Sequence, residues 1–457
     1  MAINTQVKAD HNAPAITQIL ANYISSHPSK GWDDSVEHEA HRTFLNWLGC
    51  AIGAASHESV DAALHAIQEL DPTQQASILG RKEKVDMCSA ALINGISSHT
   101  FDFDDTHLKT VIHPAGPVAS AILALGEHTN ANGRQIIDSL ILGIDVACRV
   151  GNAMYPDHYH RGWHITGSTG MLGSAAACSR LMGLDLQKTT MALGIAASQP
   201  VGMREQFGTM TKPFHPGGAA RAGQLSALLA KHGFTASPKA LEAGRGYMQT
   251  VSTKCDWSEI DRALGKSFEI SLNTYKPFAC GIVIHPAIDA CAQLRAQGVK
   301  AEDVERIELR VHPLVLELTG KKTPKDGLEG KFSVYHGCAV GLIFGQAGEG
   351  EYADDIVNRA DVVALRAKVN ATTDTSISEA SVDVKAFLKD GKEVHVFVKN
   401  AIGSVENPMS DANLEQKFTS LAEPIIGKEK TRQLISALWK LGQASDLKQI
   451  ISLCTPD

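Results

Sequence analysis

The sequence has few aromatic residues, no excess of positive charge and no long apolar run. Aromatic residues make up 5% of the 457 positions while glycine occurs 39 times, which disfavours an aromatic-rich β-sandwich and favours closely packed helices. Lys and Arg number 43 against 50 Asp and Glu, so the basic excess typical of nucleic-acid-binding proteins is missing. No run of 18 or more apolar residues occurs, and no apolar segment follows a positive one at the start. We expect a cytoplasmic protein without nucleic-acid or membrane partners.

The cysteines also lack the spacing of a metal site. Nine are scattered along the chain without a Cys-x-x-Cys pair, so neither a zinc ribbon nor an iron–sulfur motif is present in the sequence. Dispersed cysteines in an odd number are typical of reduced, mostly buried thiols. We expect no cofactor and no metal dependence.

Apolar periodicity predicts a mainly α protein with a smaller α+β domain. From about residue 15 to 197 apolar residues recur at helical spacing between short Gly, Pro or Asn breaks. Four segments carry Ala, Gly, Leu and Ile around most of the helix circumference, which indicates central helices: 118–128, 133–150, 170–181 and 186–197.

After about residue 267 strand signals appear. Residues 304–311 alternate apolar and charged side chains, as do 382–387 and 394–398, and Asp390-Gly391 between the last two is a two-residue hairpin signal. We expect an α+β domain over 268–401 with helices at 286–297 and 333–344. The helical domain would cover 1–267, with 402–457, helical over 413–453, packing back onto it.

The densest polar cluster is the segment 102–107, with three Asp and a His, followed by His113. Asp and His are the usual general acids and bases, and Pro114 and Pro117 before an Ala-rich segment indicate a helix N-terminus, where an anion is stabilised. A capped, solvated loop is the simpler interpretation. A divalent-metal interpretation lacks both the EF-hand glycine and a second acidic cluster.

A second candidate is His164, which precedes a helix opening rich in small residues. The exposed N–H groups of such an opening suit a carboxylate. His158 and His160 resemble zinc ligands, but they lack a nearby carboxylate or Cys in a ligand pattern, and we expect both in a surface loop. The nearby glycines are not a dinucleotide fingerprint because no strand precedes them.

Lys212 lies directly before Pro213 and Pro216, in a segment rigid enough to hold it as a fixed cation or, if desolvated, a base. A solvated lysine in a turn is the alternative. Lys276, Cys280 and His285 form a similar segment at the start of the second domain. No Cys–His–Asn arrangement can be read there, so Cys280 is better interpreted as a small buried residue. Tyr335 before an apolar helix is either a proton donor or a packed core residue.

The order of these segments is more specific than any one of them. The run DFDDTH…HPAG, RGWH…GSTG, GTMTKPFHPGGAARAG, YKPFACG…HP and GLEGKFSVY spans almost the whole chain and resembles the MmgE/PrpD family. That resemblance implies a large helical domain, a smaller α+β lid domain, a homodimer and chemistry without a metal. It also implies catalytic roles for Asp102, His113, His164, Lys212 and Tyr335, and substrate-binding roles for Thr106, Lys276 and His285.

The activities implied by the resemblance require stabilisation of the same kind of intermediate. Dehydration of a 2-methylcitrate-like acid and decarboxylation of a cis-aconitate-like acid both leave an electron-rich, enolate-like carboxylate that fixed cations must stabilise. A lyase of this kind on a small polycarboxylate is the leading hypothesis, with dehydration first. An epimerase of an imino- or amino-dicarboxylate such as iminodisuccinate, and a non-catalytic polycarboxylate-binding relative, are the alternatives.

Overall fold

The computed structural model describes residues 14–28 and 31–457, which divide into two compact units. Unit 1 contains the described residues up to Thr100, Asp104–Asn273 and Leu414–Asp457, and unit 2 contains Phe101–Phe103 and Thr274–Asn413. The sequence placed the boundaries after 267 and 401, whereas the units change after 273 and 413. Glu269 is held in unit 1 because its N–H donates to Asp145 Oδ1 at 2.9 Å, and Ile402 is held in unit 2 by a 2.9 Å bond to Asp289 Oδ2.

Unit 1 is a helical assembly with only short strands. Its elements are α1 (Ile16–Ser26), α2 (Asp34–Gly53), α3 (Glu58–Gln68), β1 (Ala76–Ser77), β2 (Lys84–Val85), α4 (Met87–Thr100), β3 (Asp105–His107), α5 (Ala115–Thr129), α6 (Gly133–Met154), α7 (Asp157–His160), α8 (Ile165–Leu181), α9 (Leu186–Ala196), η1 (Arg204–Gln206), α10 (Thr211–Lys231), α11 (Tyr247–Val251), α12 (Ser258–Asp261), η2 (Glu269–Leu272), α20 (Lys428–Leu438), η6 (Leu441–Gln443), α21 (Lys448–Leu453) and most of α19 (Asp411–Ile426).

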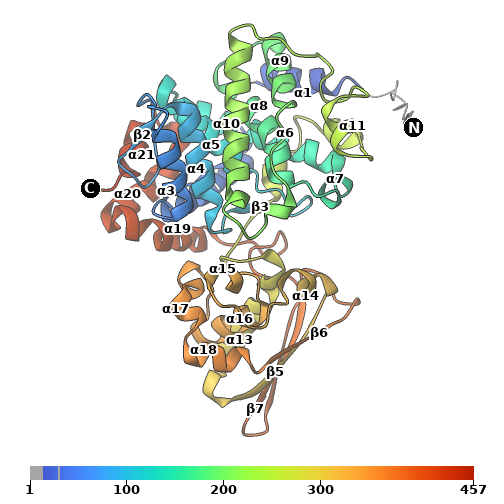
Figure 1. The fold of residues 1–457 in the computed structure, drawn as a ribbon, viewed down its shortest axis with the longest axis vertical. Helices are drawn as coiled ribbons and strands as arrows, with labels where there is room; N and C mark the ends of the chain where they lie inside the picture. Colours follow the sequence, from blue (N-terminus) through green and yellow to red (C-terminus); the bar gives the residue numbers. More distant parts are fainter. Residues whose placement is uncertain (1–13, 29–30) are drawn as a thin grey trace. The chain divides into compact units, whose positions relative to one another are not determined.

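Small residues set the packing of the central helices α4, α5, α6, α8 and α10, which lie side by side in Figure 1. At the crossing of α4 and α10, a Cβ added to Gly95 would lie 2.5 Å from Gly217 Cα, so neither position has room for a side chain. A Cβ on Gly223 of α10 would similarly lie 2.4 Å from Met171 O of α8. The Ala/Gly-rich composition therefore allows these helix backbones to approach closely. The expected central helices are present, and α8 begins earlier than predicted, at Ile165.

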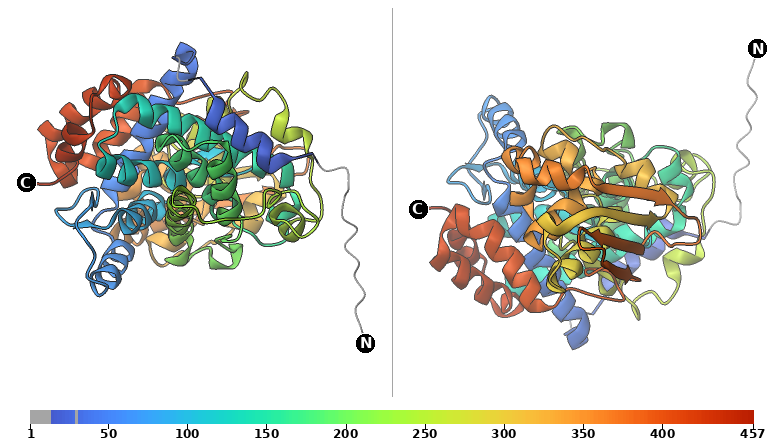
Figure 2. Two further views of the ribbon diagram at one scale, coloured as in Figure 1. Left: turned by 90° about the horizontal axis from the view of Figure 1, so that it is seen from above. Right: turned by 90° about the horizontal axis from the view of Figure 1, so that it is seen from below.

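The C-terminal helices α19, α20 and α21 form a group on one side of unit 1, drawn in red in Figure 2. Helix α19 packs on α2 at two glycines, because Gly49 of α2 faces the ring of Phe418 and Gly53 faces Leu421. Long-range contact of this kind explains why a tail distant in sequence belongs to the first unit.

Unit 2 is an α+β layer with a four-stranded sheet in the order β6-β5-β7-β8. Strand β5 pairs in parallel with β6 and antiparallel with β7, which pairs antiparallel with β8. Helices α13 and α16 pack together beside this sheet. Its elements are β4 (Asn273–Tyr275, shared with unit 1), η3 (Ile282–Ile284), α13 (His285–Ala296), η4 (Ala301–Asp303), β5 (Val304–Val311), α14 (Pro313–Thr319), α15 (Gly327–Gly330), α16 (Val334–Phe344), η5 (Glu349–Tyr352), α17 (Asp354–Val357), α18 (Ala360–Arg366), β6 (Val369–Thr373), β7 (Val382–Leu388) and β8 (Glu393–Val398).

The predicted hairpin is present, but its predicted two-residue turn is wrong. Leu388 N–H donates to Lys392 O at 2.8 Å, which leaves a three-residue loop of Lys389, Asp390 and Gly391. Gly391 has a φ of 86°, and Asp390 is not among the residues with positive φ. A two-residue type I′ turn needs positive φ at both central positions, so one left-handed glycine selects the longer loop instead.

Among the helices of residues 14–28 and 31–457, none combines the length and the apolar character needed to cross a bilayer.

Candidate active site

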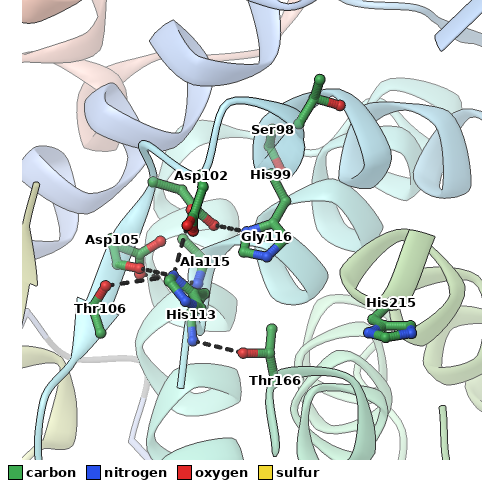
Figure 3. A network of polar contacts seen from close by, with 12 residues as sticks. Ser98, His99, Asp102, Asp105, Thr106, His113, Ala115, Gly116, Thr166 and His215 are labelled. Atoms are coloured by element: carbon green, nitrogen blue, oxygen red, sulfur yellow. Dashed lines mark hydrogen bonds and ion pairs between the residues drawn. The ribbon is translucent and has the colours of Figure 1, made fainter. Parts of the chain in front are cut away.

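The site in unit 1 is built on histidines that the fold gathers from separate helices. His99 lies at the end of α4, and His113 lies just before α5 (Figure 3). His164 is the N-cap residue of α8, and His215 lies in the second turn of α10. Neighbouring ring centroids are 4.7 Å apart for His99 and His113, and 5.0 Å for His164 and His215. We call these four residues the histidine cluster.

His113 is fixed by its backbone and by one ring nitrogen. Its N–H donates to Thr166 Oγ1 at 3.0 Å, and its Nδ1 lies 2.7 Å from the Asp105 carbonyl oxygen (Figure 3). A carbonyl oxygen only accepts, so His113 Nδ1 carries a proton and donates it. Thr106 Oγ1 lies 3.4 Å from the same nitrogen. The predicted pair Thr106 and His113 therefore meets in this structure.

The loop that delivers His113 is conformationally strained. His107 N–H bonds to Ile112 O at 2.7 Å, which closes the loop, and Val111 within it has a φ of 52°. Positive φ is costly for a β-branched residue, and such strain concentrates at functional sites.

His164 and His215 face each other through their Nδ1 atoms, 2.8 Å apart. One of the two must donate and the other accept, so the pair shares a single proton between these atoms. Burial, and then the neighbouring His99 ring and the charge of Lys212, hold the pKa of His164 well below its usual value. Burial likewise lowers the pKa of His215 to about 4.

Lys212, which the sequence predicts as a fixed cation, lies in α10 with His215. It is the second residue of α10, not a residue of an irregular turn, and Pro213 and Pro216 follow it within the helix. Its Nζ lies 5.6 Å from the centroid of the Phe207 ring. Its charge contributes to the lowered pKa values of His99, His164 and His215, which places it within electrostatic reach of all three.

Three helix N-termini meet at the histidine cluster. Helix α5 begins two residues after His113, α8 begins directly after His164, and α10 carries Lys212 and His215 in its first two turns. These helices contain 15, 17 and 21 residues. A helix N-terminus carries partial positive charge and unpaired N–H groups, so the arrangement favours an anion with several negative groups.

Two buried carboxyl groups complete the site. Asp104 Oδ2 lies 2.8 Å from His99 Nδ1, and its Oδ1 lies 3.4 Å from His113 Nδ1. Burial opposes ionisation of Asp104, but the two imidazoles outweigh it and hold its pKa well below the ordinary value. Burial and the neighbouring Asp104 instead raise the pKa of Asp105, whose Oδ2 accepts from Ala115 N–H and Asn273 Nδ2. Asp104 is thus the anion of the pair.

The remaining candidates lie in unit 2. Lys276 Nζ bonds to Asp102 Oδ1 at 2.8 Å and to Asp102 O at 2.9 Å, so these two predicted residues form an ion pair. His285 begins α13, where its ring packs edge-on to Phe278 at 5.4 Å. Tyr335 lies in the first turn of α16, and burial raises its pKa. Their roles stay predictions.

Sequence reasoning missed His99, Asp104 and His215 as site residues. Asp104 and His215 lie inside the motifs quoted above, and His99 lies three residues before Asp102 at the end of an apolar helix. Nothing in the local pattern distinguishes them from their neighbours. The expectation that His158 lies in a surface loop is wrong: it is fully buried, with Nδ1 at 3.1 Å from Val251 O and Nε2 at 2.6 Å from Ser168 Oγ.

The imidazoles could also bind a metal. One ring nitrogen from each of His99, His113 and His164 lies within 4.8 Å of the other two. Zn–N bonds of 2.0–2.1 Å in tetrahedral geometry place ligand nitrogens roughly 3.3 Å apart, a separation that lies within this limit. The metal-free chemistry expected from the sequence stays a prediction.

Comparison with known proteins decides the family. The MmgE/PrpD N-terminal domain matches residues 18–260, and the MmgE/PrpD C-terminal domain matches residues 278–441. This chain belongs to the MmgE/PrpD family. The resemblance drawn from its motifs is therefore confirmed.

Relatives within the MmgE/PrpD family carry two different names. A cis-aconitate decarboxylase of Aspergillus terreus is 25% identical, with 98% of this chain and 98% of that protein covered. The cis-aconitate decarboxylase of Mus musculus is 25% identical over 96% and 93%. The 2-methylcitrate dehydratase of Escherichia coli K12 is 23% identical over 74% of each chain.

Proposed function

We propose that this protein is a lyase that acts on a small tricarboxylate, and that its reaction is decarboxylation of a cis-aconitate-like acid. The observation that carries the proposal is the convergence of three helix N-termini and Lys212 on buried imidazoles. Helix termini and an ammonium bind carboxylates, and imidazoles are common general acids and bases. The site therefore combines an anion-binding surface with acid–base groups.

The proposed reaction uses these groups in one sequence. The C–C bond to one carboxylate breaks and CO₂ leaves, while the bonding electron pair moves into the adjacent unsaturated carboxylate system. Lys212 and the helix N-termini stabilise the negative charge that develops there. A protonated histidine then donates a proton to carbon, and the electron pair left by CO₂ forms the new C–H bond. In this scheme either His113 or His164 is the proposed donor.

The alignment lengths favour one of the two candidate reactions over the other. The decarboxylases align over 93–98% of their length, whereas the dehydratase aligns over 74%. Agreement over both domains favours decarboxylation, which reverses the order expected from motifs alone. Dehydration of a 2-methylcitrate-like acid is the second candidate because the same base and acid would remove a carbon-bound proton and a hydroxyl group.

Mass spectrometry of reaction mixtures tests the proposal. Purified protein is incubated separately with cis-aconitate, 2-methylcitrate and iminodisuccinate. Decarboxylation gives a product lighter by CO₂, dehydration a product lighter by water, and epimerisation an unchanged mass with altered optical rotation. A Lys212→Ala variant prepared in the same way controls for contaminating enzymes. Turnover of none of these acids would contradict the proposed function.

A further inference from the structure

His99 has one ring nitrogen bonded and the other without a partner. The residue is 1% exposed, its Nδ1 lies 2.8 Å from Asp104 Oδ2, and its buried Nε2 has no hydrogen-bond partner. A buried polar atom without a partner costs free energy and calls for an explanation.

The carboxylate determines the tautomer of this ring. Ionised Asp104 can only accept, so the proton of neutral His99 resides on Nδ1, and Nε2 presents a lone pair. The same carboxylate stabilises the imidazolium that forms when Nε2 takes a proton. Asp104 itself is fully buried, which keeps water from weakening this interaction.

Other buried histidines of unit 1 are bonded differently. Both ring nitrogens of His158 have partners, as described above, and so do those of His107, at 3.3 Å from Thr110 Oγ1 and 2.8 Å from Glu269 Oε2. Both ring nitrogens of these two buried histidines are therefore satisfied. The unpartnered Nε2 of His99 is unlike these.

The surroundings of His99 are those of the site. Its ring lies 4.7 Å from the His113 ring and 5.8 Å from the His164 ring, centroid to centroid. A ring nitrogen of each of the three lies within 4.8 Å of the others. A substrate that contacts His113 and His164 would therefore also reach His99.

We propose that His99 is a further proton-transfer residue of this site and that Asp104 is its positioning residue. The proposal rests on the proposed function. In decarboxylation, imidazolium Nε2–H of His99 donates its proton to carbon, the electron pair left by the departing CO₂ forms the new C–H bond, and neutral His99 regains a proton from water. In dehydration, neutral Nε2 takes the carbon-bound proton, the C–H pair forms the C=C bond, and hydroxide leaves as water with a proton from a second acid.

Substrate charge makes the cationic form of His99 accessible. In the free protein, burial lowers the pKa of His99 to about 4, and the charge of Lys212 adds to that effect. Three substrate carboxylates beside the ring would oppose both influences. The ring would then gain its proton when the substrate is bound.

The kinetic test compares His99→Gln with His158→Gln. Both variants replace a buried imidazole by a neutral amide, but only His99 has an unpartnered nitrogen. We expect His99→Gln to lower kcat/KM by 10²-fold or more, the low end for loss of general acid–base help, with KM changed less than kcat. We expect His158→Gln to stay within about threefold. In the pH profile, His99→Gln should lose one limb: the alkaline limb for decarboxylation, or the acid limb for dehydration.

An NMR measurement tests the tautomer of His99 independently of the proposed function. Nitrogen-15 NMR of histidine-labelled protein distinguishes protonated Nδ1 from unprotonated Nε2 without any substrate. In the wild type, His99 should carry its proton on Nδ1. The His99 signals are assigned as those missing from the spectrum of His99→Gln. Asp104→Asn should shift these signals. If His99→Gln does not fold, Asp104→Asn carries the kinetic test, again with loss of one pH limb.

Two results would overturn the inference. One is a His99→Gln enzyme with kcat/KM within threefold of wild type and both pH limbs intact. The other is an NMR spectrum with the proton of His99 on Nε2. If the wild type converts none of the tested acids, the proposed function fails, and the NMR result alone decides whether His99 presents a basic nitrogen.

Discussion

Unit 1 contains two buried histidine–carboxylate pairs whose histidines are eight residues apart in the sequence. His99 with Asp104 and His107 with Glu269 each have a 2.8 Å N···O contact. The second nitrogen of His107 is bonded to Thr110, whereas that of His99 has no partner. His99 Nε2 is therefore available to a substrate, whereas both ring nitrogens of His107 already have partners.

The difference shows that burial and pairing alone do not mark a catalytic histidine. Burial raises the pKa of Glu269, but hydrogen bonds from His107 and Asn152 outweigh it and lower the pKa to about 2. That pair ties β3 to η2 and so stabilises the fold. We expect substitutions in the first pair to change the rate and substitutions in the second to change stability.

The largest expected effect follows from Asp104→Asn. An amide can donate to His99 Nδ1 and reverse the tautomer, so we expect kcat/KM to fall by roughly 10²–10⁴-fold. Glu269→Gln is the matched change in the other pair and should leave kcat/KM within about fivefold. Steady-state kinetics on the acid identified by the mass assay measures both. Equal losses of kcat/KM in the two variants would contradict the view that only the His99–Asp104 pair acts in the reaction.

Lys212→Ala comes next. Loss of one preorganised cation should lower kcat/KM by about 10²-fold or more while the melting temperature changes little. Lys212→Arg is the control, since it retains the charge but replaces a compact ammonium with a planar fork. Wild-type rates in both variants would remove Lys212 from the site.

A smaller effect concerns acid stability through Glu269. Its pKa falls from an ordinary 4.5 to about 2 on folding, so its stabilisation is present above pH 4.5 and is lost as the pH drops toward 2. The shift corresponds to on the order of 3 kcal/mol. Urea unfolding from pH 6 to pH 2 should show this loss in the wild type and a flatter dependence in Glu269→Gln. Parallel curves would contradict the assignment.

The smallest expected effect is that of metal removal. We expect activity to be unchanged after dialysis against a chelator, because the reaction proposed here uses imidazoles, an ammonium and helix termini. Assays before and after dialysis, with the metal content measured in each sample, give the comparison. Loss of activity that one divalent ion restores would instead assign His99, His113 and His164 as ligands.

Much of the fold was predictable from local pattern. The alternation over 304–311 predicted β5, which spans Val304–Val311, and the apolar runs predicted α5, α6, α9, α13 and α16 to within a few residues. Strand β6 was not predicted because Val369–Thr373 is short and mostly polar, and its parallel pairing with β5 depends on a distant segment. The hairpin loop differed because the dipeptide Asp-Gly is compatible with more than one loop length.

Residue order and short-range periodicity were enough to predict the family, the helices of one region, most strands of the other and five candidate segments. Which side chains of those segments meet depends on how the helices pack. His99, Asp104 and His215 become site residues because α4, α5, α8 and α10 approach closely enough, through Gly95, Gly217 and Gly223, to bring their ends together. Which ring nitrogen stays open depends on partners up to 162 residues away, as for His107 and Glu269. No local pattern carries that information, since hydrogen-bond partners are selected by packing across the whole unit.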